Sequence, residues 1–139
     1  MKVGSNTLPA LAEGMGQVVF YRPSRITGMA LSFSVREGGK GVGKLGNGSY
    51  FVLAAAPGTH TFTIESEVTD TLILEVDPGE TYYVQQTIGM GIMMGRPRLT
   101  PSTSGAFGAK SLKLSTRKAT DDSSVAKANA AAAPSAGTN

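Results

Sequence analysis

Short stretches in which every second residue is apolar recur along this chain, and they restrict its fold more than any other feature of the sequence. The alternation is clearest in residues 29–36, 59–65 and 70–76. Successive side chains of a β-strand point to opposite faces, so a period of two gathers the apolar side chains on one face. Each stretch is therefore predicted to be a strand with one face in a core and the other in solvent.

Turn-forming residues separate these stretches. Asn-Gly at 47–48, before a further strand candidate at 49–55, and Glu-Gly-Gly at 37–39 favour tight hairpins, because these residues tolerate positive φ. Proline followed by glycine at 57–58 and 78–79 is typical of type II turns. Three shorter alternations add strand candidates: Val18 with Phe20, Tyr82 with Val84 and Ile88, and Leu112 with Leu114.

The sequence therefore predicts an all-β protein, a single small antiparallel β-sandwich of seven or eight short strands. A length of 139 residues with 40% hydrophobic residues is enough for one domain with its own core. We place the β-sandwich domain at residues 17–118. Residues 1–16 are predicted to be a flexible N-terminal segment, and residues 119–139 a disordered alanine-rich tail.

Composition argues against several kinds of active site. The chain has no cysteine, so neither disulfides nor thiolate metal sites are available, and no apolar run is long enough to span a bilayer. His60 is the only histidine, and by parity it shares the apolar side of its strand with Phe62 and Ile64. It is predicted to be a hydrogen-bonded structural residue, not a catalytic base. We predict no catalytic residue, no metal and no cofactor.

Two motifs imitate known sites. The glycine-rich segment 38–48 fits the spacing of a phosphate-binding loop, but Leu45 stands where serine or threonine would reach magnesium, and a strand candidate follows instead of a helix. It is predicted to be a hairpin. Glu65, Glu67 and Asp70 are predicted to be a solvated strand end, because the alternating pattern of a calcium loop is absent.

The second half of the domain carries the candidate binding residues. The net charge is +3, yet residues 81–120 contain six basic and no acidic residues. This basic stripe suits an anionic glycan or a lipid headgroup, whereas nucleic acid is disfavoured because aromatic residues for base stacking are missing apart from Phe107. Its members are Arg96, Arg98, Lys110, Lys113, Arg117 and Lys118. An adaptable apolar group either closes one end of the core or forms a partner surface. It consists of Met90, Ile92, Met93 and Met94.

Four segments, taken in order, resemble the bacterial domain-of-unknown-function family 2846: residues 21–25, 48–51, 57–60 and 78–84. The resemblance covers about residues 17–114. It implies a small β-sandwich of the prealbumin or carboxypeptidase-regulatory type, usually behind a secretion or lipoprotein signal. It also implies a place in the periplasm or at the outer membrane, after removal of a signal that this sequence lacks. A complete chain would be cytoplasmic. The resemblance supplies no catalytic residues.

Arg22 and Arg25 lie in the first of these segments. Two arginines at a strand end are suited to hold a carboxylate or phosphate, and the alternative is a structural ion pair of Arg22 with Glu65 or Glu75. The predicted function is a non-enzymatic accessory or structural domain of the cell envelope that binds another envelope protein or itself. The alternative is a binding module for an anionic small ligand or an envelope glycan.

Overall fold

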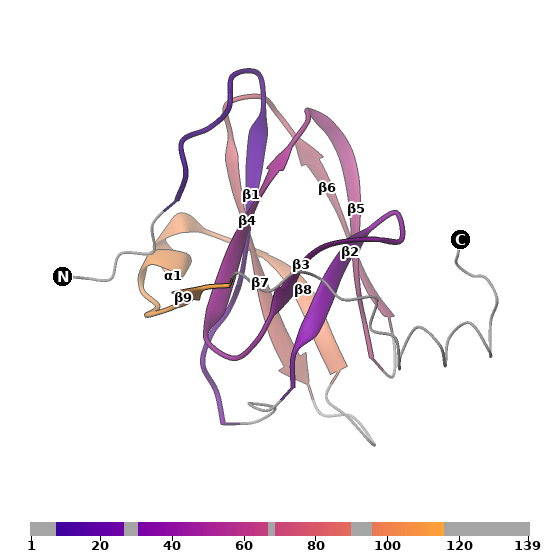
Figure 1. Cartoon of the computed structure of the whole chain (residues 1–139), viewed down its shortest axis with the longest axis vertical. Helices are drawn as coiled ribbons and strands as arrows, with labels where there is room; N and C mark the ends of the chain where they lie inside the picture. Colours follow the sequence, from indigo (N-terminus) through magenta and orange to yellow (C-terminus); the bar gives the residue numbers. More distant parts are fainter. Residues whose placement is uncertain (1–7, 27–30, 67–68, 90–95, 116–139) are drawn as a thin grey trace.

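The computed structural model describes residues 8–26, 31–66, 69–89 and 96–115. Two β-sheets face each other in this part of the chain, as Figure 1 shows, and the predicted β-sandwich is confirmed. The elements in chain order are β1 (Gly16–Arg22), β2 (Phe33–Glu37), β3 (Lys40–Leu45), β4 (Ser49–Ala55), β5 (Gly58–Glu65), β6 (Thr69–Val76), β7 (Thr81–Gly89), β8 (Arg96–Ser102), α1 (Ser104–Gly108) and β9 (Lys113–Leu114).

The five-stranded sheet has the order β8-β7-β1-β4-β9 and the four-stranded sheet the order β3-β2-β5-β6. The predicted turns join neighbouring strands or carry the chain between sheets. At 77–80, the amide of Glu80 donates to the carbonyl of Asp77 over 3.4 Å, and Gly79 has a φ of 79°. This is the conformation that the third position of a type II turn requires, as the Pro-Gly pair predicted.

The pairing is not purely antiparallel, which corrects that part of the prediction. β1 pairs parallel with β7 at the centre of its sheet, and β9 pairs parallel with β4. A two-residue hairpin makes its strands antiparallel, but no hairpin joins β1 to β7, because the whole four-stranded sheet lies between them in the chain. The turn residues therefore could not predict that β1 and β7 run parallel.

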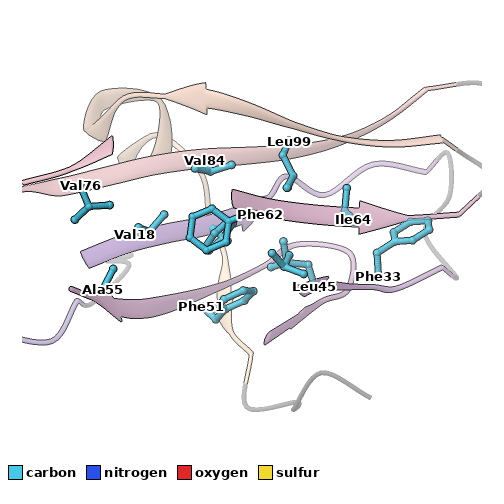
Figure 2. Packing of buried hydrophobic residues seen from close by; sticks show 12 residues of the cluster. Val18, Phe33, Leu45, Phe51, Ala55, Phe62, Ile64, Val76, Val84 and Leu99 are labelled. Carbon is cyan, nitrogen blue, oxygen red and sulfur yellow. The ribbon is translucent and has the colours of Figure 1, made fainter. Parts of the chain in front are cut away.

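Aromatic and aliphatic side chains from both sheets fill the space between them (Figure 2). The ring of Phe20 stacks on Phe51 and meets Phe62 edge to face, with centroids 5.0 Å apart in both pairs. Such aromatic pairs add to the free energy of simple burial. The buried members of this core are Val18, Phe20, Phe33, Val35, Leu45, Phe51, Ala55, Phe62, Ile64, Val76, Val84 and Leu99.

A second, smaller cluster covers the other face of β1. Phe107 of α1 packs on Tyr21, Tyr50 and Tyr83, with ring centroids 5.2 to 5.4 Å apart. α1 begins at the N-cap Thr103, whose hydroxyl accepts from the amide of Ala106. β1, which the sequence predicted only as a short strand, is consequently buried on both faces.

Two strands were not predicted, and proline or glycine is the reason in each. β8 contains Pro97 and Pro101, which are tolerated because β8 is an edge strand. β3 is rich in glycine, and at Gly43 an added Cβ would lie 2.5 Å from the ring of Phe51. The glycine-rich segment thus forms the predicted hairpin, with β2 and β3 paired antiparallel, and at Gly43 it also packs closely on Phe51.

Other boundaries differ in detail. β2 begins at Phe33, and residues 29 and 30 of the predicted strand lie outside the described residues. So do residues 1–7 and the predicted tail 119–139, whereas residues 8–15 contain no regular strand. Among the described residues, no helix is long and apolar enough to cross a bilayer.

Candidate functional site

The parallel pairing of β1 and β7 brings the C-terminal ends of both strands to one end of the sandwich. At that end, residues of β1, of the segment after β1 and of β7 line a small open pocket with an empty volume of about 200 Å³. The lining residues are Arg22, Pro23, Arg25, Gln86, Thr87 and Ile88. That volume includes open solvent, so the pocket is shallow and admits at most one small terminal group of a larger partner.

Arg22, a predicted anion-binding residue, is only 2% exposed. Its Nη1 donates to the carbonyl of Leu31 over 2.7 Å and to that of Leu45 over 3.3 Å, and the guanidinium lies 5.9 Å from the ring centroid of Phe33. Burial lowers the pKa of Arg22 from its ordinary value, because the charged form loses hydration. Nη1 is bonded to main-chain carbonyls, so Arg22 does not present an exposed guanidinium for bidentate binding. It contributes positive electrostatic potential to the pocket instead.

Of the two acidic partners considered for Arg22, Glu75 has a hydrogen bond with another residue. Glu75 accepts a hydrogen bond from the hydroxyl of Thr59 over 2.6 Å. Arg25, by contrast, is exposed at the pocket rim, and its backbone amide donates to Oδ1 of Asn47 over 2.9 Å. This bond fixes the segment after β1 to the β3–β4 turn and thereby positions Arg25.

Gln86 is the polar residue at the centre of the pocket wall. Its side chain is fully buried, and Nε2 donates to the carbonyl of Thr87 over 2.9 Å. Because a carbonyl only accepts, this bond fixes the amide orientation and leaves Oε1 as an acceptor. Within the described part of the chain, Oε1 has no hydrogen-bond partner. A buried acceptor without a donor costs about 1–3 kcal/mol, so a donor from a ligand or water is expected there.

Gln86 was not predicted as a site residue, although the sequence contains a signal for it. Gln86 continues the apolar register of Tyr82, Val84 and Ile88, so parity alone places a polar amide among core-facing residues. A polar residue in a core-facing position needs a partner, and that requirement identifies it as a candidate binding residue.

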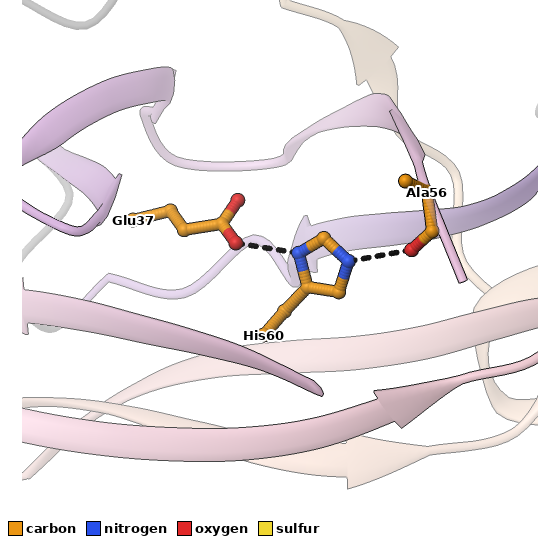
Figure 3. Close-up of polar contacts among 3 residues, drawn as sticks. All are labelled: Glu37, Ala56 and His60. Atoms are coloured by element: carbon orange, nitrogen blue, oxygen red, sulfur yellow. Dashed lines mark hydrogen bonds and ion pairs between the residues drawn. The ribbon is translucent and has the colours of Figure 1, made fainter. Parts of the chain in front are cut away.

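His60 is held as the sequence predicted (Figure 3). Its Nδ1 contacts Oε2 of Glu37 at 2.5 Å, and its Nε2 contacts the carbonyl of Ala56 at 2.7 Å. The ring also stacks on Phe62, with centroids 5.8 Å apart. Both nitrogens are engaged within the domain, so His60 is hydrogen-bonded as predicted.

The predicted basic stripe is divided by the fold. Arg96 and Arg98 lie on β8 and Lys113 on β9, and these strands are the opposite edges of the five-stranded sheet. Lys110 follows α1 and is half-buried. The structure therefore does not gather these residues into one surface. Arg117 and Lys118 lie outside the described residues, as do Met90, Ile92, Met93 and Met94.

The acidic group divides as well. Asp70 accepts a hydrogen bond from the amide of Leu99 over 2.8 Å, which links the edges of the two sheets, and Glu67 lies outside the described residues. In the described ranges, no three His, Cys, Asp or Glu side chains are arranged to hold a metal ion.

The fold and the pocket define a small two-sheet β-sandwich with a polar cleft at its strand ends. A family model described as "Protein of unknown function (DUF2846)" matches residues 12–97, which is more than half of the chain. The chain belongs to this family. The matched segment includes all six residues of the strand-end pocket and all of β6. No curated protein and no solved structure matches the chain.

Proposed function

We propose that this domain is a non-catalytic accessory module of the bacterial cell envelope that binds another polypeptide, and that the strand-end pocket receives a carboxylate-bearing group of that partner. The observation that carries the proposal is the buried Oε1 of Gln86, which has no donor in the described residues and belongs to a residue that lines the pocket. A bound partner supplies the missing donor.

The pocket selects for a group that combines a donor with a negative charge. Oε1 of Gln86 requires an N–H or O–H group. The positive charge of buried Arg22 and of Arg25 at the rim favours an anion. Phosphate and sulfate present mainly acceptor oxygens, so Oε1 repels them. The last residue of a polypeptide presents both an amide N–H and a carboxylate, and a shallow pocket at the surface can admit such a terminal group.

An acidic sugar also combines hydroxyl donors with a carboxylate, and it is the alternative ligand. Sugar-binding sites gain much of their affinity from aromatic side chains that stack on the ring. The described lining residues include Pro23 and Ile88 but no aromatic residue. The pocket chemistry therefore favours a polypeptide terminus over a glycan.

Two further observations support the wider proposal. The single histidine, the side chain most used as a general base near neutral pH, has both nitrogens engaged by Glu37 and Ala56. The location in the envelope is supported by the resemblance of this family to exported bacterial domains.

The test is a titration of ¹⁵N-labelled protein followed by NMR, with acetyl-Ala-Ala as the free acid, acetyl-Ala-Ala amide, glucuronate and inorganic phosphate as probes. We expect the free acid to shift the side-chain amide of Gln86 and Nε of Arg25, and the amide and phosphate to leave them unchanged. Stronger shifts with glucuronate assign the pocket to a glycan, and no shift with any probe contradicts a carboxylate site.

Three variants give the titration its controls. Arg25→Gln removes the rim charge and is expected to weaken binding of the free acid about tenfold or more, as the loss of one hydrogen bond to a charged group does. Gln86→Met removes the acceptor of the ligand N–H at similar volume and is expected to weaken binding about three- to tenfold, as the loss of a neutral hydrogen bond does. Lys40→Gln removes one exposed charge in the β2–β3 turn region and leaves binding unchanged.

A further inference from the structure

The edges of the two sheets differ in how well they are protected from pairing with another strand. On β8, the amide of Leu99 points away from β7, because it donates to Oδ2 of Asp70. Residues two positions away in a strand point the same way, and here they are Pro97 and Pro101, which have no N–H. This edge therefore offers no free donor at three successive outward positions.

The opposite side of the sandwich is partly covered by the chain itself. The amides of Lys113 and Ser115 donate to the carbonyls of Gly48 and Tyr50 over 3.0 and 2.7 Å. The hydroxyl of Ser115 also donates to the carbonyl of Lys44 over 2.8 Å. The segment around β9 thus occupies the beginning of the β4 edge and reaches β3.

Among the described residues, β6 is protected only near its start, where it lies against β8 and Asp70 is bonded to Leu99. It pairs along its whole length with β5 on one side and is the outer strand of the four-stranded sheet. Its sequence contains no proline and no lysine, the residues that most often block an edge. Ile73 is 67% exposed on the outer face, and the neighbouring Leu72 and Leu74 are only half-buried. A long apolar edge of this kind favours pairing with another strand.

We propose that β6 pairs antiparallel with β6 of a second copy of this chain, around a two-fold axis at Ile73. In this register Ile73 lies opposite Ile73 of the second copy, and Leu72 lies opposite Leu74. On the outer face, Thr71 lies opposite Glu75, so a hydroxyl meets a carboxylate and no two acidic residues face each other. Pairing along β6 joins the two four-stranded sheets into one.

Registers shifted by one or two residues are less favourable. Among these registers and the one centred on Ile73, only the latter makes the sequence of β6 self-complementary. A shift by one residue places the core-facing side chains of one copy on the outer face of the other. A shift by two residues in one direction sets Leu74 opposite Asp70, and in the other direction it sets Ile73 opposite Glu75. Each of these shifts pairs an apolar side chain with a carboxylate.

This surface is independent of the strand-end pocket, since none of the pocket residues belongs to β6. Asp70 remains bound to Leu99 of its own chain, so the proposed contact extends from Thr71 to Glu75. The association is isologous, because the same segment serves both copies, and it closes as a dimer instead of growing into a filament.

The chain has no cysteine, so a single introduced thiol gives an unambiguous cross-link. At the two-fold axis the two Cβ atoms are expected about 4.5–5.5 Å apart, close enough for a disulfide after small adjustments. Ile73→Cys should therefore form a disulfide-linked dimer under mild oxidation. Thr61→Cys is the matched control, because Thr61 is exposed on the same face directly opposite Ile73 but on the interior strand β5. Equal cross-linking of both variants would overturn the proposal.

Light scattering over a concentration series tests the same surface without cross-linking. Ile73→Lys is expected to weaken dimerisation at least tenfold, whereas Thr61→Lys leaves it unchanged. Thr71→Lys places a lysine opposite Glu75 of the second copy, so it should tighten the dimer several-fold at low salt and lose this gain at high salt. A wild-type chain that remains monomeric up to millimolar concentration, or a Thr71→Lys chain that dimerises less well at low salt, contradicts the pairing.

Discussion

His60 and Glu37 form a hydrogen bond between Nδ1 and Oε2 across the core-facing side of the four-stranded sheet. The other ring nitrogen faces the carbonyl of Ala56. Both partners are acceptors, and a neutral imidazole has only one N–H, so only the protonated ring satisfies both contacts. This geometry connects strands β2 and β5 and the β4–β5 turn through one titratable group.

The stability of the domain should therefore fall as His60 loses its proton. The contact with the Ala56 carbonyl is the largest cause that raises the pKa of His60 above 6.5. The hydrogen bond and charge of Glu37 and the charge of Glu75 act in the same direction, against desolvation, which lowers the pKa. A raised pKa in the folded state contributes stability below 6.5, and this contribution disappears as pH rises through the folded-state pKa. Urea unfolding should show higher stability at about pH 6 than at about pH 9.

The Glu37→Gln variant is the control for this pH dependence. It removes the negative charge beside Nδ1, so the midpoint of the His60 titration, measured by NMR, should move back toward its ordinary value. The loss of stability between the two pH values should shrink with it. An unchanged midpoint contradicts the contribution of Glu37.

Gly43 should not tolerate even a methyl group. A Cβ there would lie 2.5 Å from the ring of Phe51, which is stacked on Phe20 and only 7% exposed, so the ring has little room to move. Gly43→Ala is expected to destabilise the domain by about 1–3 kcal/mol, the usual cost of overpacking. Gly108→Ala is the control, because nothing lies within 4 Å of its added Cβ. Urea unfolding of both variants makes the comparison.

Much of the fold was predictable because local signals determine it. Alternation gave the strands around Phe62 and Leu72, and the turn at Gly79 followed from its Pro-Gly pair. The sequence did not indicate the partner of β1, since parallel pairing depends on long-range contacts and not on turns. It also did not indicate β8, since Pro97 and Pro101 resemble a loop until the strand is known to lie at an edge.

The candidate site was predictable only in part, for the same reason. Arg22 and Arg25 were identified from their position at a strand end, but their neighbour Gln86 is 64 residues from Arg22 in the chain and reaches it only through the β1–β7 pairing. Conversely, the basic residues on β8 and β9 appeared to form one stripe because they lie close together in the sequence. Strand order, which periodicity does not determine, places them at opposite edges.

Phe107 is expected to hold α1 on the five-stranded sheet. It is 3% exposed and contacts the rings of Tyr21, Tyr50 and Tyr83, three of the four tyrosines in a chain without tryptophan. Phe107→Ala should lower the free energy of unfolding by about 3 kcal/mol and change the near-ultraviolet circular dichroism, which the tyrosines dominate. Phe33→Leu, a conservative change in the main core, should alter stability less and leave the tyrosine signal largely intact.

Gln86→Met should make the free domain more stable while it weakens binding in the pocket. The substitution removes a fully buried acceptor that has no donor within the described residues and keeps a similar side-chain volume. The variant no longer carries the free-energy cost of an unsatisfied buried acceptor, but it loses the hydrogen bond to the Thr87 carbonyl. The net effect should raise the free energy of unfolding by about 0.5–1 kcal/mol. If Gln86 served only packing, its substitution would lower the stability of the domain. If it serves a ligand, its substitution raises the stability of the free domain. Urea unfolding of both proteins without ligand decides between the two roles, because a destabilised Gln86→Met variant indicates that Oε1 is satisfied within the free domain.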